Sequence, residues 1–103
     1  MAYTQLSEST YNQLVALGAR VSCERSPFGE GWRYLVECPN GYSASIVKHP
    51  FSYGGNEGFW ELAVVLHGRL VYDTPVTSDV EGWLTEDDVL ALAREVAALE
   101  AVD

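Results

Sequence analysis

Basic residues are scarce in this 103-residue chain. Six Lys and Arg stand against 15 Asp and Glu, which gives a formal net charge of −9. A nucleic-acid-binding surface needs clustered Lys and Arg to displace the counterions of the phosphates. Attachment to an anionic membrane depends on a similar cluster. The composition therefore argues against direct binding of nucleic acid and against binding to a membrane surface.

Long apolar runs are missing as well. No stretch approaches the roughly 18 consecutive apolar residues of a membrane span. The opening sequence MAYTQLSEST has neither the basic start nor the apolar run of a secretory signal. We therefore expect a protein of the cytoplasm.

Cysteine and histidine are each present only twice. In a reducing compartment Cys23 and Cys38 are expected to be free, partly buried thiols. Neither belongs to a Cys-x-x-Cys pair, and His49 and His67 lack the spacing of zinc ligands. A site built from all four is geometrically conceivable, but the pattern favours a protein with no metal and no other cofactor.

Apolar and aromatic residues are plentiful. Hydrophobic residues make up 48% of the chain, and three Trp, six Tyr and three Phe are among them. This is enough apolar material for a core, and the length fits one domain over residues 1–103.

A helix is predicted near each end of the chain. Ser7 can cap the first helix, in which the apolar residues recur at spacings of three and four, and Gly18 can end it. Thr85 and Asp88 resemble a capping box at the start of the second helix. The apolar stripe of that helix is formed by Val89, Leu92, Ala93, Val96 and either Ala97 or Leu99.

Between the helices the apolar period changes to two. Residues 31–38 and 42–48 alternate as half-buried strands, and the turn sequence Pro39-Asn40-Gly41 between them predicts a tight hairpin. Residues 59–66 are apolar on both faces, as in a central strand, and 69–72 return as a fourth strand.

These elements predict the α+β class. We expect an antiparallel four-stranded meander with the N- and C-terminal helices packed on one face. An extra edge strand near residues 20–24 would make it five-stranded. Residues 49–58 are expected to form a loop, and 73–82 to be irregular.

No catalytic motif is recognisable. The two histidines are the only clear bases at neutral pH, and no Ser or Cys stands in a nucleophile motif beside them. His67 is expected to be solvated at a hairpin tip. The glycine-rich stretch 53–58 leads into a strand and lacks the Lys-Ser/Thr ending of a phosphate loop. We therefore expect that the protein is not an enzyme.

Acidic residues gather before and within the start of the second helix. Their spacing does not match a calcium loop. They are interpreted as a helix cap with a solvated face, or as an acidic surface that docks on a basic partner. Mimicry of nucleic acid would need evenly spaced carboxylates. The residues concerned are Asp79, Glu81, Glu86, Asp87 and Asp88.

The aromatic residues exceed what two short helices can cover. Trp60 is expected in the core, and Trp83 either plugs the core or contacts a partner, the plug being the more common role. Because binding residues concentrate on loops, we predict a contact surface from the 51–58 loop and the 79–83 segment. Its candidate residues are Phe51, Tyr53, Gly54, Gly55, Asp79, Glu81 and Trp83.

Several short motifs resemble a known family. They are Ser43–Val47, Ser52–Gly55, Trp60–Val64, Leu70–Val76 and Asp79–Thr85. Together they are similar to a family of small accessory proteins of actinobacteriophages, notably of the mycobacteriophage type, most of which have no assigned function. The resemblance implies a phage origin, residence in the host cytoplasm and action by binding host proteins, in some cases with toxicity to host growth. It implies no catalytic residue.

The leading hypothesis is a phage-encoded accessory protein that binds and inhibits a host protein without chemistry of its own. One alternative is a self-associating phage structural or assembly component that pairs through a sheet edge. Another is an anti-defence protein that sequesters a small ligand or mimics nucleic acid. A homodimer is compatible with all three hypotheses.

Overall fold

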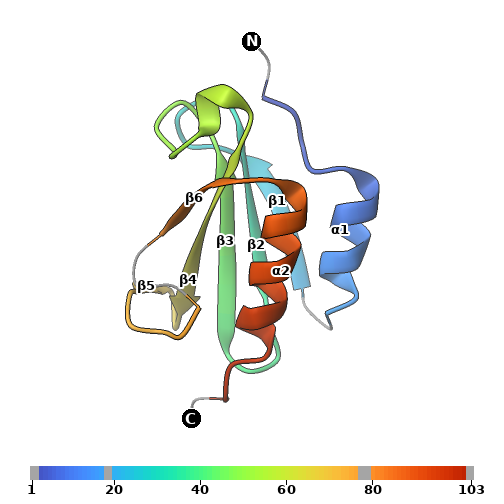
Figure 1. Ribbon diagram of the computed structural model, residues 1–103, viewed down its shortest axis with the longest axis vertical. Helices are drawn as coiled ribbons and strands as arrows, with labels where there is room; N and C mark the ends of the chain where they lie inside the picture. The colour runs from blue at the N-terminus through green and yellow to red at the C-terminus, as the bar shows by residue number, and fades with distance from the viewer. Residues whose placement is uncertain (1–2, 18–19, 77–79, 102–103) are drawn as a thin grey trace.

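The computed structural model describes residues 3–17, 20–76 and 80–101 as one antiparallel sheet with two helices (Figure 1). The α+β class expected from the sequence is confirmed. In chain order the elements are α1 (Glu8–Val15), β1 (Arg20–Arg25), β2 (Trp32–Glu37), β3 (Tyr42–Lys48), the 3-10 helix η1 (Gly55–Glu57), β4 (Trp60–Leu66), β5 (Arg69–Val71), β6 (Glu81–Leu84) and α2 (Glu86–Ala97).

The sheet is a meander from β1 to β5. Neighbouring strands pair in that order, every pair is antiparallel, and β6 also pairs with β4. The edge strand expected near residues 20–24 is β1, so the meander has the five strands of that alternative, and β6 makes six strands in the sheet. Figure 1 shows α1 and α2 together in front of the sheet, as the two-layer expectation requires. In the described part of the chain, no helix is long and apolar enough to cross a membrane.

The core lies between the sheet and the two helices. Because side chains alternate across a strand, every second residue of β2, β3 and β4 faces the helices. Trp60 belongs to this core, as expected, with 2% of its surface exposed. The fully buried aliphatic residues are Leu14, Val36, Ala44, Ile46, Leu62, Val64, Val89, Ala93 and Val96.

The segment 73–82 is not wholly irregular as expected. Its last residues, Glu81 and Gly82, belong to β6, in which Leu84 pairs with Trp60 of β4. Residues 77–79 lie outside the described residues. The strand was not predicted because the segment 73–82 is polar in composition, and because the backbone partners of β6 come from a distant part of the chain.

The helix starts follow the sequence signals. Ser7 caps α1, since its side chain accepts a hydrogen bond from Thr10 N. Thr85 and Asp88 form the expected capping box at the start of α2, with reciprocal bonds of 3.0 and 3.2 Å. The expected end of the first helix at Gly18 lies outside the described residues; α1 itself ends at Val15.

The turn between β2 and β3 also holds the end of α2. The side-chain amide of Asn40 donates to the carbonyl oxygens of Val96 at 2.9 Å, Ala97 at 3.3 Å and Leu99 at 2.9 Å. The last carbonyls of a helix have no partner within the helix, so another donor must satisfy them. Asn40 provides that donor and fixes the last helix against the hairpin.

Replacement of Asn40 should therefore destabilise the whole domain. We expect Asn40→Ala to lower the free energy of unfolding by about 1–3 kcal/mol, because the carbonyl oxygens of Ala97 and Leu99 lose a donor. Urea unfolding followed by circular dichroism measures this. Asn12→Ala is the matched control, because the exposed Asn12 side chain forms no hydrogen bond within the described residues. Equal stability of the two variants would contradict this role of Asn40.

Candidate functional site

The 51–58 loop and the start of β6 meet at one end of the sheet. Trp83 N donates to Tyr53 O at 3.1 Å, and Tyr53 N donates to Glu61 Oε1 at 3.0 Å. The rings of Trp83 and Phe59 pack with their centroids 5.8 Å apart. The structure thus brings together the two segments that the sequence analysis combined in one contact surface.

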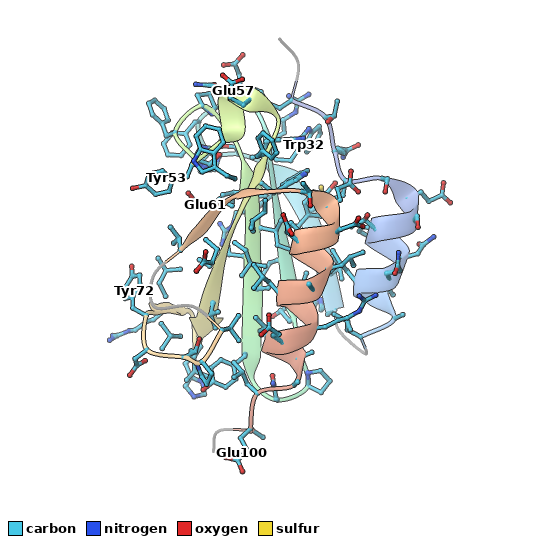
Figure 2. The ribbon with its side chains drawn as sticks, viewed as in Figure 1. Trp32, Tyr53, Glu57, Glu61, Tyr72 and Glu100 are labelled. Carbon is cyan, nitrogen blue, oxygen red and sulfur yellow. The ribbon has the colours of Figure 1, made fainter. Side chains whose placement is uncertain are left out.

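Four exposed aromatic side chains lie in these two segments or pack against them. Phe51 is 74% exposed, Tyr53 63%, Trp83 58% and Phe28 53%. Phe28 and Phe51 stack edge to face, with 4.9 Å between ring centroids. We call these four residues the aromatic surface. Figure 2 shows Tyr53 extending away from the body of the molecule.

The sequence favours Trp83 as a plug of the core, but the structure shows that its side chain is exposed. Its backbone has φ +56°, a left-handed conformation that bulky residues rarely adopt. Such a conformation costs on the order of 1–3 kcal/mol and persists only where the surroundings hold it. Here the hydrogen bond to Tyr53 O and the contact with Phe59 hold it. The fold therefore maintains a strained backbone that presents an exposed indole ring.

Two glycines permit this close contact. Gly54 has φ +86°, and a Cβ there would lie 3.0 Å from Trp83 Cδ2. A Cβ on Gly82 would collide with Tyr53 Cβ. Gly55, the third candidate glycine of the sequence, lies at the start of η1, where a Cβ would collide with His49 O. The candidate glycines 54 and 55 thus shape the surface and are themselves buried.

His49 anchors the beginning of the loop. Its Nδ1 accepts a hydrogen bond from Phe51 N at 3.0 Å, and its ring lies 4.7 Å from that of Phe28. Ser52 Oγ accepts a hydrogen bond from the amide of His49 and donates one to its carbonyl oxygen. Burial lowers the pKa of His49, and the charge of Glu61 offsets part of this effect.

The acidic residues have separate roles. Glu81 is exposed at the first position of β6, while Asp79 lies outside the described residues. Glu86 instead joins the two helix starts, because its carboxylate accepts from Ser7 N at 3.1 Å and Ser7 Oγ at 2.8 Å. Burial alone would raise the pKa of Glu86, but hydrogen bonds from Thr10 and Ser7 outweigh it and the pKa is lowered.

The remaining candidate groups do not converge. Cys23 is exposed and Cys38 is buried, and both are free thiols. Among residues 3–17, 20–76 and 80–101, no three His, Cys, Asp or Glu side chains are grouped so as to hold a metal ion. His67 is exposed at the β4–β5 turn, as expected.

Phe28 was not predicted as part of the site. It belongs to the turn between β1 and β2, and its sequence context SPFGEG indicates only a turn. Its position beside Phe51 arises because β2 and β3 pair in a register that sets Trp32 opposite Lys48. No local signal in the sequence reports such a proximity.

Substitution of Gly82 should separate the loop from β6. We expect Gly82→Ala to lower the free energy of unfolding by about 1–3 kcal/mol, because the new Cβ overlaps Tyr53. It should also shift the NMR signal of the Trp83 indole N–H. Gly58→Ala is the control: it has φ +86° but open space around its Cβ. We expect it to cost about 1–2 kcal/mol and to leave the Trp83 signal in place. An unmoved signal in Gly82→Ala would contradict the close contact.

The loop should weaken on acidification. The folded pKa of His49 lies below its ordinary value, so the unfolded chain takes up the proton first, and the stability contributed by neutral His49 is present above about pH 6.5 and is lost below it. Protonation of Nδ1 also removes the acceptor for Phe51 N.

Urea unfolding at about pH 7.5 and about pH 5.5 tests this dependence. The wild-type protein should lose more stability between the two values than His49→Asn does. The pKa of Glu86 is also lowered, but this group affects stability only below its ordinary pKa of 4.5. Its contribution is the same in both proteins. Identical losses would show that His49 does not contribute.

No known protein family, no curated protein and no solved structure matches the chain. The resemblance to actinobacteriophage accessory proteins therefore stays a prediction. What the protein does must be inferred from its own residues. The aromatic surface includes three of the seven candidate binding residues, Phe51, Tyr53 and Trp83.

Proposed function

We propose that this protein is a phage-encoded accessory protein that binds a host protein through the aromatic surface and inhibits it, without chemistry of its own. The observation that carries the proposal is Trp83: its side chain is 58% exposed while its backbone is held at φ +56°. Backbone strain that persists in a fold concentrates at functional sites. The phage origin and the host partner are what the sequence resemblance implies.

The composition of the surface supports binding to a protein. Trp, Tyr and Phe are enriched at the centres of protein interfaces, where a few aromatic anchors supply most of the binding energy. Tyr53 and Trp83 are joined by a backbone hydrogen bond, so their backbones are fixed before a partner arrives. Preorganisation of this kind reduces the entropy that binding costs.

The charges around the surface favour a basic partner. Glu57 and Glu81 are exposed in the two segments that build it, and the whole chain carries −9. Figure 2 places Glu57 above Tyr53, with Glu61 close beneath. A partner that fits would offer an apolar pocket framed by Lys and Arg. Such complementarity speeds encounter and makes association sensitive to salt.

Self-association through a sheet edge is less favoured. β1 and β5 are the edge strands of the meander. β1 carries Arg20, Glu24 and Arg25, and the short β5 carries Arg69. Charged side chains on an edge strand oppose pairing with another chain.

The proposal predicts that two aromatic residues determine binding. A tagged protein expressed in a mycobacterial host should arrest growth and recover one stoichiometric partner. Trp83→Ala and Tyr53→Ala should each weaken that complex at least about tenfold in a direct binding assay, as loss of an interface anchor does.

Tyr72→Ala is the matched control, because Tyr72 is 52% exposed and lies further along the molecule in Figure 2. This variant should bind as the wild-type protein does. Full binding by Trp83→Ala and Tyr53→Ala would overturn the assignment of the surface. Normal growth together with recovery of the protein only with itself would favour the self-associating component instead.

A further inference from the structure

A cavity of about 310 Å³ lies near the N-terminal segment, and none of the residues that line it belongs to the aromatic surface. Its walls come from four distant parts of the chain: Tyr3 and Thr4, the β1–β2 turn at Glu30, the end of β3 at Lys48, and Gly55, Asn56 and Gly58 in and after η1. The N-terminal wall is held in place because Trp32 Nε1 donates to Tyr3 O at 2.9 Å. Figure 2 shows Trp32 in the upper part of the molecule, where the chain begins.

Lys48 lines this cavity and is the only lysine in the sequence. It is 3% exposed, although lysine is almost never so deeply buried without a charged partner. Its Nζ donates to Thr4 Oγ1 at 3.0 Å and lies 4.3 Å from the centroid of the Trp60 ring. Within the described residues no carboxylate comes close enough to form an ion pair with it.

The ammonium group of Lys48 is therefore only partly satisfied. It carries three N–H donors, and among the described residues one acceptor, Thr4 Oγ1, meets it. Burial lowers the pKa of Lys48, and the charge of Glu86 acts in the opposite direction. An apolar residue at this inward-facing position would avoid the desolvation cost. The Trp60 ring also faces the ammonium group, which leaves at least one N–H donor for an acceptor in the cavity.

Two further polar groups line the cavity. Tyr3 Oη donates to Asn56 Oδ1, which leaves both N–H groups of the Asn56 amide without an acceptor in the described chain. Glu30 is exposed and takes part in no ion pair within the described residues. The cavity therefore combines a cation, an amide donor and a carboxylate.

We propose that this cavity binds a small zwitterion, an α-amino acid, with its carboxylate on Lys48 and Asn56 and its ammonium group on Glu30. A simple anion would meet the charges of Glu30 and Glu86 as well as that of Lys48. An amino acid carries a positive group that pairs with Glu30 and a carboxylate that takes the available donors. The volume is at the lower end for ligand pockets, which fits a ligand of this size.

A single lysine makes the test direct. Protein labelled with ¹³C-lysine gives one ¹³Cε signal, which belongs to Lys48. We would titrate the folded protein with each proteinogenic amino acid at constant ionic strength. We would then repeat the titration with acetate, which lacks the amine, and with methylammonium, which lacks the carboxylate. At least one amino acid should shift the Lys48 signal with saturation, and acetate and methylammonium should bind at least about tenfold more weakly.

Two variants separate the contacts. Glu30→Gln keeps the exposed side chain's shape and should weaken amino-acid binding about tenfold. It should not weaken acetate binding, because the variant removes a negative charge that repels the acetate. Lys48→Met keeps the length and removes the charge, and calorimetry should then detect no amino-acid binding. If Lys48→Met does not fold, the Glu30→Gln and acetate titrations still decide the proposal.

Three results would overturn this site. They are the absence of a saturable shift with any amino acid, acetate binding as tight as that of the best amino acid, and unchanged binding in Glu30→Gln. Because the cavity and the aromatic surface use different side chains, Trp83→Ala should bind the amino acid normally.

Discussion

The backbone pairing of β4 is the interaction on which the rest of the structure depends. This strand pairs with β3 along its length, with β5 through residues 64–66 and with β6 from Trp60. Its inward residues form the centre of the core beneath α2. The pairing with β6 returns the chain to the start of α2 and places Trp83 beside Tyr53. Loss of this pairing would separate the core and the aromatic surface together.

The connection between β3 and β4 contributes to two different places on the molecule. Phe51 and Tyr53 belong to the aromatic surface, while Gly55 and Asn56 line the cavity at Lys48. Gly55 fits between them because a Cβ at its position would collide with His49 O and Ser52 Oγ. Close backbone packing thus lets a short loop contribute to both places, and both proposals depend on its conformation.

Acidic residues in this protein are structural as well as surface groups. Asp88 completes the capping box of α2, and the Glu86 carboxylate accepts hydrogen bonds from the Ser7 hydroxyl and amide at the start of α1. Each places a negative charge near the positive end of a helix dipole, where it stabilises the helix. The interpretation of the acidic run as a helix cap is thereby supported for part of the run, and Glu81 is exposed.

The sequence by itself determined the local structure: the hairpin around Pro39-Asn40-Gly41, the capping box at Thr85, the alternation of β2 and β3, and the buried Trp60. Each depends on residues that are neighbours in the chain, so propensity and period report them. It also identified two of the three segments that form the aromatic surface, the 51–58 loop and the segment 79–83. Only the tertiary structure decided that Phe28 belongs there and that Lys48 is buried. Those features arise from strand register and from packing between distant segments, on which local composition carries no information.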